Sequence, residues 1–364
     1  MQAFKKIYLP LLIISFLFLS CKKENPIETE SQVPQPPTQV NEFDLVGLEG
    51  EVLTSFSVNQ KEPWRIIAIS GTSTYVTDNY GKNWMNVLPD IFSSVITWDP
   101  IKANIVYNAI RTQSDSLNSK YGWNVLLLKS TDYGYTWSKS DSGITPYGFY
   151  IRTLAIDPLD NNIIFAGMTD VAPYFSGDVY KTSDGGKRWV SLAPSGTLGG
   201  SSLGRVLNVV KNAQIPQTIL LTHSEHSYFK SQDDGKTWQL KNTEWTISKL
   251  SLCKNAELTL ATISSDLLIS KNSGESFEAI NYYPFKVSNL NSVLAYSNDL
   301  LFVSTKYRLS DTSLVYYSKD MGSTWAALGT DLDTKTSLDF DSKNNFLYVV
   351  MDGVKKGLYR YKLK

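Results

Sequence analysis

The chain has 364 residues, of which 35 are basic and 35 acidic, so its formal net charge is zero. A nucleic-acid-binding surface needs clustered excess positive charge, and this balance does not supply it. The same balance gives no general attraction to anionic membranes. Tyr and Trp, with 21 and 9 residues, favour strands over helices. Because a single all-β domain can exceed about 250 residues, we expect one large β domain.

The first 20 residues have the layout of a signal peptide. Lys5 and Lys6 precede an apolar run over residues 7–19, which is too short for a transmembrane helix. The run ends in Ser20 and Cys21, and a small residue followed by Cys at this place resembles the lipobox of bacterial lipoproteins. That resemblance implies that Cys21 is the lipidated first residue of the mature protein and its only attachment to the membrane. The alternative is an ordinary signal peptide that ends near a Cys.

Residues 21–42 are rich in Pro, Glu, Gln and Thr. Such a segment cannot bury apolar surface and is predicted to be an extended, disordered tether. The charged residues 22–24 resemble the surface-export signals of Bacteroidota lipoproteins, which implies the outer membrane or the cell surface of a bacterium. The predicted organisation is therefore a signal peptide (1–20), a lipid-anchored tether (21–42) and a globular domain (43–364). Cys253, the only other cysteine, is expected to be a small core residue.

One eight-residue pattern, Ser/Thr-x-Asp-x-Gly-x-Thr-Trp, recurs six times along the globular part. The copies occupy residues 77–84, 130–137, 182–189, 231–238, 270–277 and 318–325. They align without gaps, and their last residues are separated by 39 to 53 positions. Self-similarity at such a spacing is typical of repeat architectures in which each repeat is one supersecondary unit.

The pattern has a local physical logic. An Asp or Asn at position three can accept hydrogen bonds from backbone N–H groups of its own turn, and Gly at position five supplies a positive φ. The aromatic residue at position eight precedes the next strand and can bury a large apolar area between repeats. We therefore interpret the pattern as a structural turn without a catalytic role. The residues at position three are Asn79, Asp132, Asp184, Asp233, Asn272 and Asp320.

These eight residues resemble the Asp-box of BNR-type β-propellers. That superfamily includes sialidases, sortilin-like receptors, xyloglucanases and a photosystem II assembly-factor family. The resemblance implies a β-propeller whose boxes lie away from the binding face. It predicts a fold and leaves the reaction open, because one fold serves many functions.

A second repeat precedes each box and predicts the inner strands. Residues 94–100 and 152–158 align closely, and both end in Asp-Pro. Looser copies begin at Thr54, Arg205, Ser248, Ser288 and Thr336. Seven inner strands indicate seven blades, although the last blade has no box and only three strands. We expect residues 43–46 to supply its missing outer strand, which closes the ring and removes an open sheet edge. The fold class is thus an all-β, seven-bladed propeller, expected to be monomeric.

The loops that join strands two and three of each blade, and each blade to the next, gather on one side of a propeller, where ligands commonly bind. We call this side the loop face. Its predicted loops are rich in aromatic and charged residues, which suit a sugar or a peptide. The alternative is that most of these rings pack the loops themselves. The ligand-binding candidates there are Tyr121, Trp123, Tyr174, Trp245 and Arg308.

The aligned first residues of the inner strands contain two adjacent arginines among small hydroxyl residues. Arg152 and Arg205 fall in blades three and four. Two guanidinium groups side by side repel unless an anion or a carboxylate lies between them. We therefore predict an anionic subsite for an acidic sugar or a peptide carboxylate. The alternative is that both arginines pair with carboxylates of the chain, such as Asp170 or Glu225.

Signs of catalysis are sparse. A glycosidase needs two carboxyl groups that flank the scissile bond, and Asp170 is the one candidate in the sequence. Its segment, residues 168–171, faintly resembles the surroundings of a catalytic aspartate in xyloglucanases. Asp99 and Asp157 precede Pro and are interpreted as turn residues. His223 and His226 lack a third His or Cys nearby, so no metal or cofactor is expected.

The sequence therefore favours a cell-envelope lipoprotein whose non-catalytic propeller binds a protein or a glycan on the loop face. The alternative is a glycoside hydrolase or another carbohydrate-active enzyme on the same scaffold. No nucleic-acid partner is expected.

Overall fold

The structure, a computed structural model, describes residues 42–113, 123–144, 149–170, 177–192, 206–211, 215–224, 226–253, 258–263, 266–280, 288–297, 299–307, 313–332, 334–353 and 355–364. They fall in one compact unit, Pro36–Lys364. All regular secondary structure among these residues is β-strand. None of them forms a helix that could span a membrane.

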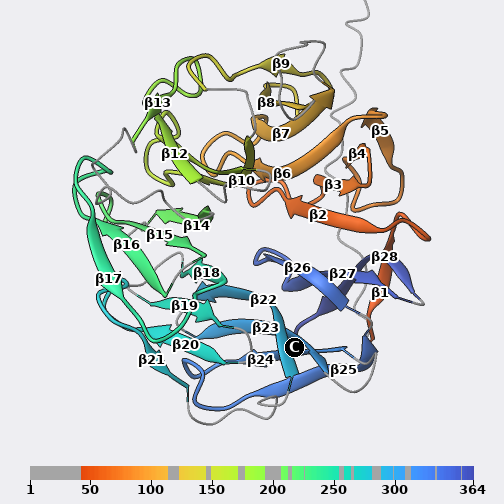
Figure 1. Cartoon of the computed structure of the whole chain (residues 1–364). Helices are drawn as coiled ribbons and strands as arrows, with labels where there is room; N and C mark the ends of the chain where they lie inside the picture. The colour runs from red at the N-terminus through yellow and green to blue at the C-terminus, as the bar shows by residue number, and fades with distance from the viewer. Residues whose placement is uncertain are drawn as a thin grey trace, which may run out of the picture. The chain divides into compact units, whose positions relative to one another are not determined.

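The strands form seven antiparallel sheets of four strands each, arranged as blades around a central axis (Figure 1). Blade one contains β2 (Leu53–Val58), β3 (Ile66–Ser70), β4 (Ser73–Thr77) and β5 (Met85–Leu88). Blade two contains β6 (Phe92–Trp98), β7 (Val106–Gln113), β8 (Trp123–Ser130) and β9 (Ser138–Lys139). Blade three contains β10 (Phe149–Ile156), β11 (Ile164–Asp170), β12 (Gly177–Thr182) and β13 (Val190–Ser191).

Blade four contains β14 (Val206–Lys211), β15 (Ile219–His223), β16 (Ser227–Ser231) and β17 (Gln239–Asn242). Blade five contains β18 (Lys249–Leu252), β19 (Thr259–Thr262), β20 (Leu267–Ser270) and β21 (Glu278–Ala279). Blade six contains β22 (Ser288–Ser297), β23 (Leu300–Tyr307), β24 (Ser313–Ser318) and β25 (Ala326–Leu332). Blade seven contains β26 (Thr334–Asp341), β27 (Phe346–Asp352), β28 (Lys356–Lys362) and β1 (Asp44–Gly47).

The seventh blade is completed by the N-terminal strand, as predicted. β1 pairs antiparallel with β28, with Asp44 opposite Arg360. In Figure 1 the orange-red β1 lies beside the blue β28. Val46 of β1 is buried in a cluster with Phe346 of blade seven and Phe56 of blade one. The N-terminal strand therefore contributes to the core and covers an edge that β28 would otherwise expose.

The aromatic residue at position eight of each box packs between its own blade and the preceding one, as predicted. Trp189 is 2% exposed and shares a cluster with Tyr107 of blade two. Its indole N–H donates to the Ser140 carbonyl at 2.7 Å. The other box aromatics pack against corresponding clusters: Trp84, Trp137, Trp238, Phe277 and Trp325. The boxes therefore join neighbouring blades.

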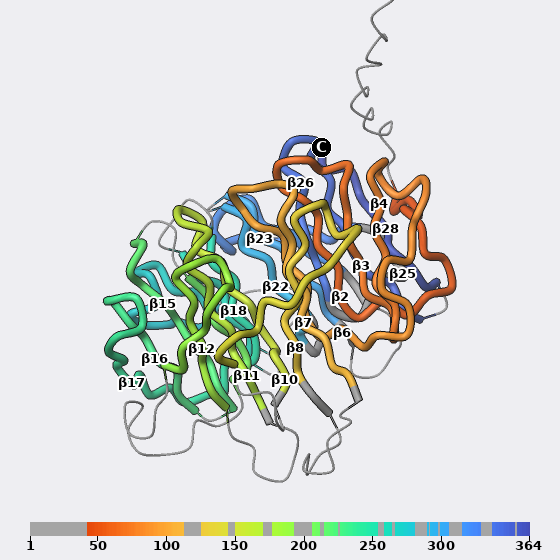
Figure 2. The backbone as a smooth tube through the Cα atoms, turned by 90° about the horizontal axis from the view of Figure 1, so that it is seen from above, coloured from red at the N-terminus to blue at the C-terminus, as the bar shows by residue number. Residues whose placement is uncertain are grey.

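Inner strands of neighbouring blades lie side by side, as β2, β6 and β10 do in Figure 2. Several inner strands contain a bulge at a corresponding place. The extra residue is Thr54 in β2, Ser94 in β6 and Arg152 in β10. In β14 it is Leu207, and in β22 it is Asn291. The predicted alignment of Arg205 and Ser288 with Arg152 is therefore wrong by two and three residues. The extra residue of a bulge interrupts the two-residue alternation of its strand, so an alignment by apolar pattern can slip there.

Candidate functional site

The Asp132 turn shows how each box is built. Oδ1 of Asp132 accepts hydrogen bonds from the Ser130 hydroxyl at 2.7 Å and the Thr136 N–H at 2.9 Å. Its Oδ2 accepts the Thr136 hydroxyl at 2.6 Å, and the Ser130 hydroxyl oxygen accepts the Gly134 N–H at 2.8 Å. Equivalent hydrogen bonds surround the position-three residues of the other boxes: Asn79, Asp184, Asp233, Asn272 and Asp320. The carboxylates are thus occupied by their own turns.

The turn also needs a feature that the sequence analysis missed. Both positions four and five have positive φ, for example 64° at Tyr133 and 88° at Gly134. Position four is occupied by Gly in one box only, at Gly185. Non-glycine residues carry a modest cost in this conformation, which the hydrogen bonds of the turn offset.

A cationic and aromatic cluster lies on the loop face, beside the start of β10. The guanidinium carbon of Arg111, on β7, is 4.2 Å from the ring centroid of Phe92 and 5.1 Å from that of Tyr150. Nη1 of Arg152 donates to the Tyr150 hydroxyl at 3.5 Å. Tyr150 therefore contacts two arginines, and Arg152 is exposed. We call Arg111, Tyr150, Arg152 and the nearby Lys249 the cationic cluster.

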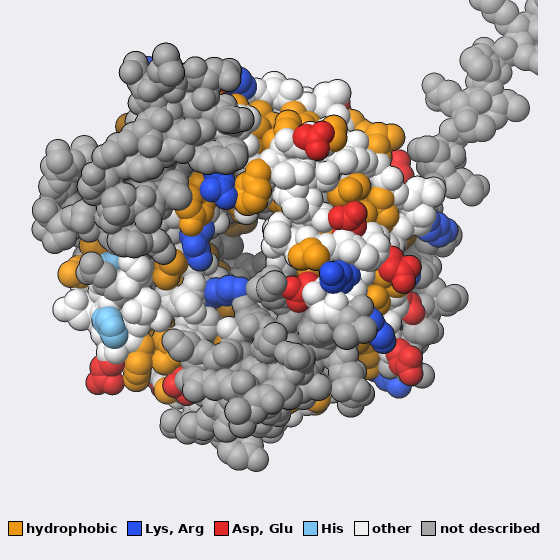
Figure 3. Space-filling model, turned by 45° about the vertical axis from the view of Figure 1, so that its right-hand side comes forward, with side chains coloured by type: hydrophobic (Ala, Val, Ile, Leu, Met, Phe, Trp, Pro, Cys, Tyr) orange, Lys and Arg blue, Asp and Glu red, His pale blue; other side chains and the backbone are white. Residues whose placement is uncertain are grey.

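Lys249 begins β18 in blade five, two blades from Arg152. Burial, together with the charge of Arg152, lowers its pKa to about 8. Burial also lowers the pKa of Arg111, which still remains charged. No carboxylate of a described residue forms an ion pair with Arg111 or Arg152. In the view of Figure 3, Lys and Arg side chains gather beside the hollow at the centre of the propeller.

The structure places only some of the predicted ligand-binding residues. Arg152 belongs to the cationic cluster. Trp245 is half-buried and packs against the core between blades four and five, including Ile247 and Leu250. Trp123 and Asp170 stand at loop-face ends of β8 and β11, but their side chains lie outside the described part. Four further candidates and the lipidation site also lie outside it: Tyr121, Tyr174, Arg205, Arg308 and Cys21.

The two histidines have separate partners. A ring nitrogen of His223 lies 2.8 Å from the Ser227 hydroxyl, and Nδ1 of His226 lies 3.0 Å from the Glu244 carbonyl. Within the described ranges, no group of three His, Cys, Asp or Glu residues lies close enough to hold a metal ion.

The aspartates that precede proline act in turns, as the sequence indicates. Oδ1 of Asp99 accepts the N–H groups of Ile101 and Lys102, both at 2.8 Å. Oδ1 of Asp157 accepts the Leu159 N–H at 2.8 Å. Both side chains therefore stabilise the turns that follow their strands.

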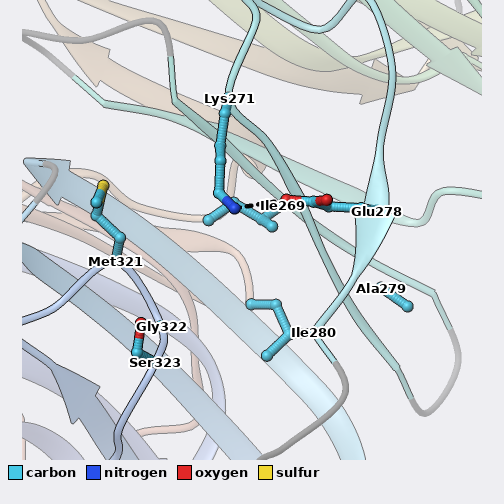
Figure 4. A pocket seen from close by; sticks show the side chains of 8 residues that line it. All are labelled: Ile269, Lys271, Glu278, Ala279, Ile280, Met321, Gly322 and Ser323. Atoms are coloured by element: carbon cyan, nitrogen blue, oxygen red, sulfur yellow. Dashed lines mark ion pairs between the residues drawn. The ribbon is translucent and has the colours of Figure 1, made fainter.

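A cavity of about 310 Å³ lies at the rim, between β21 and the box of blade six (Figure 4). Lys271 and Glu278 form an ion pair of 2.6 Å beside it, and Ile280 and Met321 supply apolar walls. The ion pair is exposed, so it contributes little to stability. A second cavity, of about 780 Å³, lies at the channel mouth opposite the loop face.

The fold and the six boxes define the class of this protein, which is a seven-bladed Asp-box β-propeller. No family model matches the chain. Over 306 residues, or 77% of this chain, the sequence is 22% identical to vacuolar protein sorting/targeting protein 10 of Fusarium vanettenii, of which the match covers 18%.

Two solved structures share the architecture. The GH74 xyloglucanase from Xanthomonas campestris matches with a TM-score of 0.66 and 17% identity, over 88% of this chain and 53% of that chain. YCF48 bound to D1 peptide matches with a TM-score of 0.60 and 17% identity, over 91% of this chain and 100% of that chain. The chain thus spans about a fifth of the sorting protein and about half of the xyloglucanase. At these identities the likeness shows the fold alone.

Proposed function

We propose that this propeller is a non-catalytic binding module that holds an anionic group of a protein or glycan ligand at the loop-face mouth of its channel. The observation that carries the proposal is the cationic cluster, in which Arg111 and Arg152 both contact Tyr150. In this proposal Arg111 and Lys249 join Arg152 in the anionic subsite that the sequence predicted.

Electrostatics supports an anionic ligand. Arg152 and Lys249 repel each other, and burial already disfavours the charged form of Lys249. A carboxylate between them would relieve both penalties and could accept charge-assisted hydrogen bonds. The Tyr150 and Phe92 rings add apolar surface, which suits a sugar ring or a peptide side chain.

The comparisons favour binding over catalysis in one respect. The YCF48 chain, which is bound to a D1 peptide, is matched over its full length, whereas only about half of the xyloglucanase chain is matched. A peptide-binding relative of the same size is therefore the nearer analogue for a single propeller.

The alternative remains a carbohydrate-active enzyme, a glycosidase-type hydrolase. Its support is the likeness to the xyloglucanase, together with Asp170 at the loop-face end of β11. An enzyme of this kind needs a second carboxyl group about 5–10 Å from Asp170.

A single experiment separates the two functions. Residues 43–364 are applied to glycan and peptide arrays, and every glycan that binds is then tested for hydrolysis. We expect saturable binding of acidic sugars or acidic peptides without turnover. Hydrolysis that Asp170→Asn abolishes would overturn the proposal in favour of the enzyme. If Arg152→Ala and Arg205→Ala both bind the ligand as the wild type does, the proposed anionic subsite is contradicted.

We also propose that the chain is anchored to the bacterial cell envelope through lipid on Cys21, at the outer membrane or the cell surface. The support is the signal-like segment 1–20 and the polar tether 21–42. Growth with a clickable fatty-acid analogue should label the wild-type protein and not Cys21→Ser. Equal labelling of both would contradict the anchor.

A further inference from the structure

The inner strands end at the face where the boxes lie, because alternate strands of each blade run in opposite directions. We call this side the box face. The cavity of about 780 Å³ opens there and is lined by the last residues of inner strands from all seven blades. Its volume falls in the range of small-molecule pockets, which is about 300–1,000 Å³. It is distinct from the cationic cluster, which lies at the opposite mouth.

One part of the cavity wall is apolar. Val58, Trp98, Ile156 and Leu252 contribute to it. The Trp98 indole N–H donates to the Ser57 carbonyl at 3.0 Å, so the polar atom of this side chain is already satisfied. At the rim, Leu159 also lines the cavity and is 61% exposed. An apolar ligand body would cover this surface.

The carboxylates that line the cavity are engaged by hydrogen-bond donors. Oδ2 of Asp339 accepts the Val58 N–H at 2.8 Å, and its Oδ1 accepts the Phe340 N–H at 2.8 Å. Asp99 accepts two backbone N–H groups through Oδ1, and its Oδ2 accepts the Asn161 amide at 2.6 Å. These hydrogen bonds hold both carboxylates in the wall, with their oxygens turned towards donors of the protein.

The lysines that line the cavity differ in their partners. Lys211 is buried and forms ion pairs with Asp157 and Asp234. Lys343 donates to the backbone carbonyl of Lys61, an uncharged acceptor. Neither Lys61 nor Lys343 forms an ion pair with a carboxylate of a described residue. The mouth between blades seven and one therefore presents two exposed ammonium groups, those of Lys61 and Lys343, beside the carboxylate of Asp339.

We propose that the box-face mouth is a second binding site, which takes a small organic anion with an apolar body. The apolar body occupies the wall formed by Trp98, Ile156 and Leu252, and the anionic group lies towards Lys61 and Lys343. This site does not depend on the proposed function of the loop face.

The test uses the aromatic sulfonate 8-anilinonaphthalene-1-sulfonate, whose fluorescence rises in apolar surroundings, with the folded chain. We expect saturable binding to one site. Leu159→Glu and Lys343→Glu should each weaken it about tenfold, since each places a negative charge at the mouth. Leu240→Glu and Lys236→Glu are matched controls at exposed positions away from the cavity, and both should bind as the wild type does. Arg152→Ala should also leave binding unchanged, because it alters only the loop face.

A matched pair of competitors tests the charge of the ligand. 4-Phenylbutyrate should displace the sulfonate at a concentration about tenfold lower than the uncharged 4-phenylbutanamide. Absence of saturable binding by a protein with a native melting curve would overturn the proposal. Equal loss of binding in the control variants, or equal displacement by the two competitors, would overturn it as well. An acidic peptide that displaced the probe where 4-phenylbutyrate did not would show that the site takes a macromolecule instead.

Discussion

At the scale of a single residue, the charge of Lys249 should make anion binding depend on pH. Burial and the charge of Arg152 lower the pKa of this side chain to about 8. Near neutral pH it is mostly protonated and can attract an anion, and it loses that charge as the pH rises through about 8. A bound anion would raise the pKa of Lys249, so binding takes up a proton above that pH.

The affinity for an anionic ligand should therefore fall about tenfold between about pH 7 and pH 9. Titrations of the array-selected ligand at several pH values measure this fall. Lys249→Gln should bind weakly with a flat profile over the same interval. A wild-type profile as flat as that of the variant would show that Lys249 takes no part.

At the box turns, Asp132 accepts three hydrogen bonds from Ser130 and Thr136. Asp132→Ala should lower the free energy of unfolding by about 1–2 kcal/mol, since these donors lose their acceptor. Asp132→Asn should cost less, because Asn79 and Asn272 occupy the same position in other boxes. Chemical denaturation measures both changes. Lost ligand binding by a stable Asp132→Ala protein would contradict a purely structural role.

The Glu275 carboxyl should make the stability of the folded protein depend on pH in the acidic range. Hydrogen bonds from Lys241 and Lys230 lower the pKa of this carboxyl to about 2. The stabilisation is therefore complete above the unfolded pKa of 4.5 and is lost as the pH falls from there towards 2. The melting temperature of the wild type should fall more steeply than that of Glu275→Gln in this interval. Parallel curves would show that the ion pairs contribute nothing.

Among the elements, β1 closes the ring by adding the fourth strand to blade seven. Without it, blade seven would keep three strands and β28 would expose its edge. Gly81 lies so close to Val46 that an added Cβ would approach the Val46 carbonyl oxygen to 2.4 Å. β1 is therefore packed tightly against blade one as well as paired with blade seven.

Removal of residues 42–47 should lower the free energy of unfolding by at least about 2 kcal/mol, because the buried Val46 side chain is lost with the strand. Removal of residues 1–41 alone should leave it unchanged. Differential scanning calorimetry of the two truncated chains checks this. Equal stability of both would contradict closure by β1.

The sequence was enough to predict the seven blades. It was not enough to predict how the residues of the inner strands align from blade to blade. The boxes recur with the same hydrogen-bonding residues, so they identify each turn between strands three and four. The inner strands carry equivalent bulges at Arg152 and Leu207, which interrupt the alternation of apolar residues, so the sequence alignment wrongly placed Arg205 opposite Arg152. Lys249 directly follows Ser248 of the aligned repeat, but its burial next to Arg152 depends on the curvature of the ring. No local sequence pattern predicts that Lys249 of blade five lies near Arg152 of blade three.

In the whole molecule, seven blades place two different mouths at the ends of one channel. The loop-face mouth carries exposed Arg152 and the other members of the cationic cluster, as the sequence indicated in part. The box-face mouth combines residues from all seven blades, each unremarkable in its own repeat. Such a cavity exists only after the ring has closed, which is why sequence patterns did not indicate it.

The central claim is that Arg152 binds an anionic group of the ligand on the loop face. The most direct test is the dissociation constant of the array-selected ligand for wild type, Arg152→Ala and Arg188→Ala, the last an exposed arginine of a box. We predict that Arg152→Ala weakens binding about tenfold or more, through loss of a charge-assisted hydrogen bond, and that Arg188→Ala has no effect. Equal affinities of all three proteins would contradict the claim.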